Sequence, residues 1–437
     1  MIARFLALFL ALFVTAHAPD ARAVPQGATP PVTQAETIWA KLRRGYLAKR
    51  YANPHVNKSS LGPQVMASPP TVTVVTTQPS GLTKYFSWGS GTASPASFLV
   101  TGGDAYTWAG GLRVPVTTLT NGGSNGNVSN GRNAVGWRVK TFVDSTKFAV
   151  QVVQGGNYRL VVDGQYVAST VWTPTNGGFS NWIVADFTSA GGRARREVWI
   201  EGDQSATFYA LWVSPTESVE PAPSGLRMTV FGDSITGATS SGVTVPSLND
   251  GFAYVLGDCF GITDVRASGS GGEGILQPAN TPTTGAYTLR QRLPYDAVQS
   301  DVFVIAMGSN DASFGASALT AEMLLDIQWL RTNYPAAPVI VFGAPGNQSG
   351  PSATTIAIEN AYAAAVTAAN DPMVIFVPVS TAPTPMLFGT GKYGATNSSG
   401  NSDLYVGSDG THPTAAGHPY WGAWLADHVY AAIQSKP

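Results

Sequence analysis

The chain has little charge and almost no cysteine. Lysine, arginine, aspartate and glutamate make up 12% of its 437 residues, and the formal net charge is −1. This balance gives no reason to expect a nucleic acid as partner. Cys259 is the single cysteine, so no disulfide can form within the chain and its stability must come from buried cores. Five scattered histidines and no phosphate-binding glycine loop lead us to expect neither a metal nor a cofactor.

Long apolar runs are also missing beyond the N-terminus. Residues 5–14 are apolar but too few to cross a bilayer, and they lie between Arg4 and the small-x-small sequence Ala21-Arg22-Ala23. This is the pattern of a secretory signal peptide, with cleavage expected after Ala23. We therefore expect residues 1–23 to be removed and the protein to be secreted or periplasmic. An uncleaved anchor is the alternative.

A basic helix is expected within residues 24–70, which otherwise form a linker. Residues 34–51 place Ile38 and Leu42 on one side of a helix. Its other residues are strongly basic: Lys41, Arg43, Arg44, Lys49 and Arg50. Such a helix could contact an envelope lipid or an anionic glycan. The favoured alternative is a helix that packs on the body of the protein with its basic side in solvent.

Residues 71–213 change to an alternating pattern. Asp163-Gly164, a favoured hairpin turn, stands between two apolar stretches. Strands are expected at residues 137–143, 148–152, 158–162, 165–167, 182–187, 196–201 and 207–213. Short strands separated by glycine, asparagine and serine predict an antiparallel β-sandwich of jelly-roll type.

Exposed aromatic residues of this domain could bind a glycan, although strand aromatics more often fill the core. The candidates are Trp88, Tyr106, Trp108, Trp137, Trp172 and Trp182.

The C-terminal half predicts an α/β domain. A proline-containing linker at residues 214–225 precedes it. Within residues 226–437, strands are expected at 226–231, 262–266, 301–307, 338–342 and 373–377, and helices at 250–260, 318–333, 353–369 and 415–433. This alternation predicts a parallel sheet between two layers of helices.

Three short motifs of this domain carry the chemistry. Ser234, in Gly-Asp-Ser, follows an apolar run, so it is expected where a strand ends. Gly-Asp-Ser alone often marks only a turn. A serine hydroxyl is a weak nucleophile that needs an imidazole base and a carboxylate to orient the imidazole. His412 and Asp409, in Asp-Gly-Thr-His-Pro, meet that need, and Gly-Ser-Asn-Asp at residues 308–311 follows another apolar run.

These motifs resemble those of the SGNH/GDSL hydrolases, and the resemblance covers residues 226–433. It implies a flavodoxin-like fold with Ser234 as nucleophile, His412 as general base and Asp409 as its orienter. It also implies an oxyanion hole formed by the N–H groups of Ser234 and Gly272 and the side-chain amide of Asn310. The register of the glycine motif is open by one or two residues. The sandwich resembles the jelly-roll domain that precedes the hydrolase domain in carbohydrate esterase family 2.

The expected function is therefore hydrolysis of short acyl esters, with O-acetyl groups on a polysaccharide favoured as substrate. A lipase or polyester hydrolase would need a long apolar groove, which Leu276, Met386, Leu387 and Phe388 could line. A glycan O-acyltransferase would use the same chemistry with a sugar hydroxyl in place of water. A glycan-binding protein with a vestigial hydrolase domain is the non-enzymatic alternative.

Overall fold

The computed structural model describes most of the chain after residue 36. The described residues are 37–52, 65–87, 107–110, 119–120, 136–177, 180–203, 206–222, 225–241, 250–279, 287–297, 300–389 and 400–436. Residues 37–437 form one compact unit. The expected signal peptide and the spacer up to residue 36 lie outside the described residues, as do Trp88 and Tyr106. Within the described ranges, no helix combines the length and the apolarity that a membrane crossing requires.

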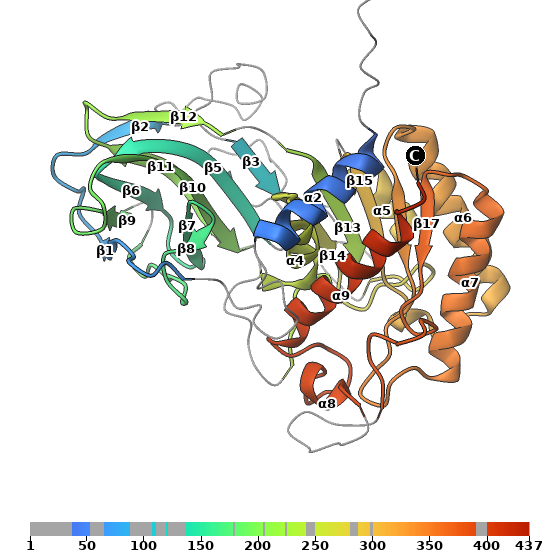
Figure 1. The fold of residues 1–437 in the computed structure, drawn as a ribbon. Helices are drawn as coiled ribbons and strands as arrows, with labels where there is room; N and C mark the ends of the chain where they lie inside the picture. The colour runs from blue at the N-terminus through green and yellow to red at the C-terminus, as the bar shows by residue number, and fades with distance from the viewer. Residues whose placement is uncertain are drawn as a thin grey trace, which may run out of the picture. The chain divides into compact units, whose positions relative to one another are not determined.

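The N-terminal half contains two antiparallel sheets (Figure 1). One has the order β1-β9-β6-β11-β2 with β4 beside β11, and the other has the order β12-β5-β10-β7-β8 with β3 beside β5. The strands are β1 (Thr71–Val75), β2 (Thr83–Ser87), β3 (Thr107–Gly110), β4 (Leu119–Thr120), β5 (Gly136–Ser145), β6 (Lys147–Val152), β7 (Tyr158–Val162), β8 (Gln165–Tyr166), β9 (Asn181–Asp186), β10 (Ala194–Asp203), β11 (Thr207–Val213) and β12 (Ser218–Pro221).

One apolar core joins the two sheets. It contains Val139 and Ile200 from one sheet and Phe148 and Ile183 from the other, all at most 1% exposed. The seven strands expected from the alternating pattern are present, and the jelly-roll assignment stays a prediction. The segment expected as a linker contributes a strand of its own, because β12 pairs with β5 along the edge of the second sheet.

The β7–β8 hairpin shows how the sequence sets a turn. Asp163 and Gly164 both have positive φ, 50° and 79°, as a two-residue hairpin turn requires. The Asp163 carboxylate also accepts a hydrogen bond from the Glu197 N–H at 2.9 Å. The turn is therefore fixed to the neighbouring strand β10.

The aromatic candidates of the sheets divide into two groups. Trp137 is 3% exposed and Trp182 is 7% exposed, so both belong to cores. Trp172 is half-buried. The side chain of Trp108 lies outside the described residues.

The C-terminal half is a five-stranded parallel sheet in the order β14-β13-β15-β16-β17 (Figure 1). Its elements are β13 (Arg227–Gly232), α4 (Phe252–Cys259), β14 (Asp264–Gly269), α5 (Leu289–Asp296), β15 (Val302–Ala306), the 3₁₀ turn η2 (Ser309–Asp311), α6 (Ala316–Asn333), β16 (Val339–Phe342), α7 (Ala353–Ala369), β17 (Val374–Val377), α8 (Ser402–Tyr405) and α9 (Gly417–Ala432).

Helices cover both faces of this sheet, which confirms the expected three layers. In β15, Val302 and Val304 face the core shared with α4 and α9, whereas Phe303 and Ile305 face the core shared with α5, α6 and α7. The strand is apolar throughout because both of its faces are buried. The expected strands and helices are all present, and α5 and α8 are additional.

The basic helix α2 (Ile38–Ala52) packs on the C-terminal half. Trp39 and Leu42 are at most 1% exposed in the core that contains α4 and α9. Arg43 donates to the carbonyl of Ile433 at 2.8 Å, and Tyr46 stacks on Tyr430. The apolar side of the helix thus contacts the body of the protein, as the favoured alternative has it, and a glycan or lipid contact through its basic side stays a prediction.

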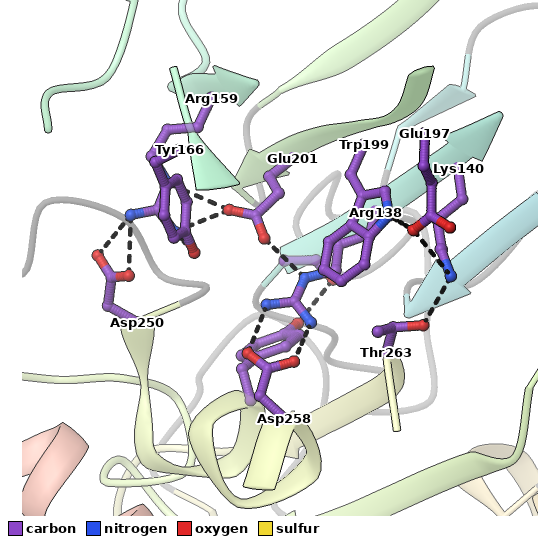
Figure 2. A network of polar contacts seen from close by, with 12 residues as sticks. Arg138, Lys140, Arg159, Tyr166, Glu197, Trp199, Glu201, Asp250, Asp258 and Thr263 are labelled. Carbon is purple, nitrogen blue, oxygen red and sulfur yellow. Dashed lines mark hydrogen bonds and ion pairs between the residues drawn. The ribbon is translucent and has the colours of Figure 1, made fainter. Parts of the chain in front are cut away.

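A buried ionic network joins the sandwich strands to the C-terminal half (Figure 2). Glu201 on β10 is 1% exposed and contacts Arg138 and Arg159, each at 2.7 Å. Arg138 also pairs with Asp258 on α4 at 2.9 Å, and Arg159 pairs with Asp250, just before α4, at 2.8 Å. Burial alone would raise the pKa of Glu201, but the two guanidinium groups lower it. The negative charge of Glu201 therefore compensates the buried positive charges of Arg138 and Arg159.

The variant Glu201→Gln should destabilise the protein by about 3–5 kcal/mol, since it leaves two buried guanidinium groups without their shared carboxylate. Urea unfolding measures the effect. Glu220→Gln is the matched control, because Glu220 pairs with Arg195 at 2.9 Å with both side chains about half exposed. That loss should stay below about 1 kcal/mol. Equal losses for the two variants would contradict the importance given to the buried network.

Candidate active site

Ser234 lies in the loop that directly follows β13, at the carboxyl edge of the parallel sheet. The turn depends on Gly232, because a Cβ there would lie 1.9 Å from Thr236 Oγ1 and 2.6 Å from the carbonyl oxygen of Ala306. The Thr239 N–H donates to the Ser234 carbonyl at 3.0 Å. This bond closes the loop and leaves the Ser234 side chain half-buried.

Ser234, His412 and Asp409 form one chain of hydrogen bonds. Ser234 Oγ lies 2.7 Å from His412 Nε2, and His412 Nδ1 lies 2.6 Å from Asp409 Oδ2. The other oxygen of Asp409 accepts the N–H groups of Thr411 and His412, each at 3.0 Å. Partial burial alone would raise the pKa of Asp409, but the hydrogen bonds from Thr411 and His412 lower it. Asp409 is therefore ionised at neutral pH, and its hydrogen bond with Nδ1 fixes the orientation of the imidazole.

The site is partly accessible to solvent. The His412 side chain is 23% exposed and the Asp409 side chain is 41% exposed. A substrate group carried on a large molecule can therefore reach the imidazole without a deep channel.

Gly272 and Asn310 approach Ser234 from neighbouring segments. Asn310 Nδ2 donates to the carbonyl of Glu273 at 2.9 Å and lies 3.4 Å from Asp233 Oδ2. It therefore sits between the residue before Ser234 and the residue after Gly272. Gly272 has a φ of 73°, which favours glycine. Among the residues that the structure describes, the N–H groups of Ser234 and Gly272 are not used in backbone pairing.

Asp311 holds the loop that follows Gly272. Its carboxylate accepts the N–H groups of Ile275, Leu276 and Gln277 at 2.7–3.0 Å and the hydroxyl of Tyr362 at 3.0 Å. These bonds give Asp311 a structural role.

Asp233 has a similar role in the loop of Ser234. Its carboxylate accepts the Ile235 N–H at 2.9 Å. Burial raises the pKa of Asp233 to about 6.

A second ionic cluster beneath the loops was not found from the sequence. Arg292 on α5 pairs with Glu273 at 2.8 Å and with Asp296 at 3.0 Å, and Arg266 pairs with Asp296 at 3.0 Å. All four are at most 4% exposed. The i,i+4 spacing of Arg292 and Asp296 was the available signal, but Pro294 between them argued against a helix.

A small apolar pocket lies next to the site. Asp233 and Ile235, the neighbours of Ser234 in sequence, line it together with aromatic and aliphatic side chains that include Phe252, Met386 and Trp421. Neither Ser234 nor His412 lines it. In the described part of the chain, no cluster of three or more histidine, cysteine or acidic side chains is arranged to hold a metal.

His418 is buried at the start of α9 and supports the loop of Ser234. Its Nε2 lies 3.1 Å from the carbonyl of Thr239, and its Nδ1 accepts the Phe252 N–H at 3.4 Å. Burial lowers the pKa of His418 to about 4. The imidazole is therefore neutral at physiological pH, and its role is structural.

Residues 230–419 match the model of the GDSL-like Lipase/Acylhydrolase family. This part of the chain is a GDSL-type acylhydrolase domain, and the protein is an ester-hydrolysing enzyme. No curated protein sequence is similar enough to count as a match.

Solved structures with a similar fold share little sequence with this chain. A carbohydrate esterase family 2 enzyme plus carbohydrate binding domain from Corynascus thermopiles (Myceliophthora fergusii) has a TM-score of 0.52 and 19% identity, over 75% of this chain and 99% of that one. An active-site mutant of a family two carbohydrate esterase from Clostridium thermocellum has a TM-score of 0.51 and 17% identity, over 76% and 98%. A salicylyl-acyltransferase from a tetracycline biosynthetic pathway has a TM-score of 0.50 and 13% identity, over 77% and 98%. At these identities the likeness shows the fold alone.

His418 predicts a specific dependence of stability on pH. An unfolded histidine titrates near pH 6.5, so between about pH 6.5 and pH 4 the unfolded chain binds a proton that native His418 does not. Stability is therefore fully present above about pH 6.5 and falls as the pH drops towards 4, by up to about 3 kcal/mol. Urea unfolding from pH 4 to 7 measures this slope, and His418→Gln should reduce it. An unchanged slope in the variant would show that other groups cause it.

Proposed function

We propose that this protein is a secreted serine esterase that removes short acyl groups, above all O-acetyl groups, from a polysaccharide. The observation that carries the proposal is the continuous hydrogen-bond chain from Ser234 Oγ through His412 to Asp409, with contacts of 2.7 Å and 2.6 Å. A nucleophile, a base and an orienter in this order are the parts that acyl transfer through serine requires.

In the first half of the reaction, Ser234 Oγ attacks the ester carbonyl while His412 Nε2 takes the hydroxyl proton. Asp409 remains ionised and stabilises the imidazolium that forms. The tetrahedral intermediate places negative charge on the former carbonyl oxygen. In this proposal, the N–H groups of Ser234 and Gly272 and the side-chain amide of Asn310 donate hydrogen bonds to it. The position of these residues after three adjacent strand ends supports that assignment.

The intermediate then collapses. The bond from the carbonyl carbon to the leaving alcohol oxygen breaks, and His412 Nε2 donates its proton to that oxygen. In the second half, His412 takes a proton from water, the hydroxide attacks the acyl-enzyme, and the acid leaves as Ser234 Oγ regains a proton.

The described residues favour a short acyl group. Of the four side chains that could line a long groove, Met386 and Leu387 are 1% exposed and Leu276 is half-buried. Only Phe388 among them is exposed, at 38%. A lipase or polyester hydrolase would need a longer apolar surface than these side chains offer.

A polysaccharide substrate agrees with three observations. The half-buried His412 and the exposed Asp409 can be reached by an acyl group that projects from a polymer. The N-terminal sequence has the pattern of a secretory signal. Two of the similar folds belong to carbohydrate esterases, which by itself is an analogy.

An acyltransferase is the second candidate, favoured by the similar fold of a salicylyl-acyltransferase. The two reactions share the acyl-enzyme and differ in the acceptor, which is water or a sugar hydroxyl. Incubation of the enzyme with an activated acetyl ester and a cello-oligosaccharide distinguishes them. Free acetate as the main product supports the esterase, whereas acetylated sugar supports the transferase.

The variant Ser234→Ala should lower kcat by at least about 10³-fold with the fold intact, because it removes the nucleophile. The assay measures release of p-nitrophenol from acetate, butyrate and octanoate esters, followed by acetate release from acetylated xylan. We expect the wild-type enzyme to prefer the acetate ester and to release acetate from the polymer. Activity that rises with chain length would point to a lipase, and a fully active Ser234→Ala would refute the proposed nucleophile.

The variant Asn310→Ala should lower kcat by roughly 10²-fold with KM nearly unchanged, since an oxyanion donor acts in the transition state. Steady-state kinetics on p-nitrophenyl acetate measure both constants. A thermal melt beside the kinetics accounts for the lost bond to the Glu273 carbonyl. A rise in KM at constant kcat would instead make Asn310 a residue that binds the substrate.

A further inference from the structure

One buried guanidinium contacts both segments that carry the proposed catalytic groups. Arg292 on α5 is 1% exposed. Its Nη2 lies 3.4 Å from the carbonyl oxygens of Gly232 and Ser268, and its Nη1 donates to Ser268 Oγ at 2.8 Å. Its Nε donates to Glu273 Oε1 at 2.8 Å. Arg292 thus contacts the end of β13, the end of β14 and the loop that follows β14.

These contacts lie close to the proposed machinery in sequence and in space. Gly232 is the last residue of β13, two positions before Ser234. Glu273 follows Gly272 directly, and its carbonyl accepts the hydrogen bond from Asn310 at 2.9 Å. Arg292 therefore connects to Gly272 and Asn310 through Glu273 alone, and to Ser234 through Gly232 and Asp233.

We propose that Arg292 is a positioning residue, which sets the separation between the nucleophile at the end of β13 and the oxyanion donors on the loop after β14. This inference rests on the proposed esterase function. Arg292 does not touch the substrate; it acts through Gly232, Ser268 and Glu273.

The shape of the side chain suits this role. A guanidinium is planar and presents its N–H donors in a fixed fork, so contacts at Nε and at both Nη atoms fix three neighbours relative to one another. A lysine ammonium would keep the charge but could not hold three segments in one plane. The role thus depends on geometry as well as on charge.

The two carboxylates that pair with Arg292, Glu273 and Asp296, differ in their other partners. Asp296 is bound by Arg266 at 3.0 Å and by Ser268 Oγ at 2.6 Å, in addition to Arg292. Glu273 pairs with Arg292 through Oε1, while its Oε2 has no hydrogen-bond partner among the described residues. The position of the Glu273 side chain therefore depends on Arg292 more than the position of Asp296 does. The backbone of Glu273 belongs to the loop that carries Gly272 and accepts the hydrogen bond from Asn310.

The test compares Arg292→Lys with the wild-type enzyme in steady-state hydrolysis of p-nitrophenyl acetate. The lysine still balances the charges of Glu273 and Asp296, but it lacks the planar set of N–H donors of the guanidinium. We expect kcat to fall by about 10- to 100-fold, because small displacements of reacting groups have effects of this size. KM should change by less than about threefold, because the groups that move act in the transition state.

Arg331→Lys is the matched control. Arg331 on α6 pairs with Asp371 at 2.8 Å and donates to the carbonyls of Tyr334 and Ala337, so it joins several segments in the same way. Asp371 precedes β17, at the edge of the sheet opposite to Ser234. Arg331→Lys should lower the melting temperature without a change in kcat. If Arg292→Lys and Arg331→Lys have the same kcat, the proposal is wrong.

A second variant keeps the test decisive if Arg292→Lys does not fold. Glu273→Ala removes the partner of the Arg292 Nε while Asp296 still neutralises the guanidinium. We expect kcat to fall by about tenfold at nearly constant KM, and Glu273→Gln, which retains an acceptor, to recover most of the loss. Wild-type kcat in Glu273→Ala would overturn the proposal.

Coupling to Asn310 separates positioning from a general structural role. If Arg292 acts through the oxyanion loop, the losses in Arg292→Lys and Asn310→Ala should not add in the double variant, because both remove the same stabilisation. Fully additive losses would contradict the proposal. If the wild-type protein hydrolyses no ester faster than Ser234→Ala does, the proposed esterase function itself is refuted. Failure of the esterase function is thus distinguished from failure of the role proposed for Arg292.

Discussion

The candidate site exists because the strands that carry it are parallel and adjacent. β14, β13 and β15 lie side by side, and their carboxyl ends meet at one edge of the sheet. Gly272, Ser234 and Asn310 each follow one of these strand ends. His412 is 178 residues from Ser234 in sequence, and the loop before α9 brings the two side chains into contact. Sheet topology therefore determines which residues lie near Ser234, and the loops determine the distances between their side chains.

Buried charge makes this arrangement specific. Glu201 joins two arginines of the sandwich strands, and these in turn pair with Asp250 and Asp258 in the C-terminal half. Arg292 joins the strand ends beneath the candidate site in a similar way. A buried charge without its partner is costly, so each network favours the one packing in which all members are paired. In both cases the paired residues are far apart in the sequence.

Much of the fold and the core of the site could be predicted from the sequence. β15 was found because a strand buried on both faces is apolar throughout. The sequence also predicted that Ser234, His412 and Asp409 act together, because their types and motifs match a known chemistry, and the structure brings the three side chains into contact. Helix α5 was missed because Pro294 and three charged residues hide its short apolar side. Arg292 and Glu273 were missed because pairing across 19 residues leaves no local pattern, so each looks like an ordinary surface charge. β12 was missed because an edge strand needs few apolar residues.

The most direct test of the account is covalent labelling with a p-nitrophenyl alkylphosphonate, followed by intact-mass measurement and peptide mapping. A phosphonate reacts with an activated serine by forming an oxygen–phosphorus bond as p-nitrophenol leaves, and the adduct resembles the tetrahedral intermediate. The account predicts one adduct per chain, on Ser234, and a strongly reduced labelling rate in His412→Asn. Labelling at another residue, or an unchanged rate in His412→Asn, would contradict it.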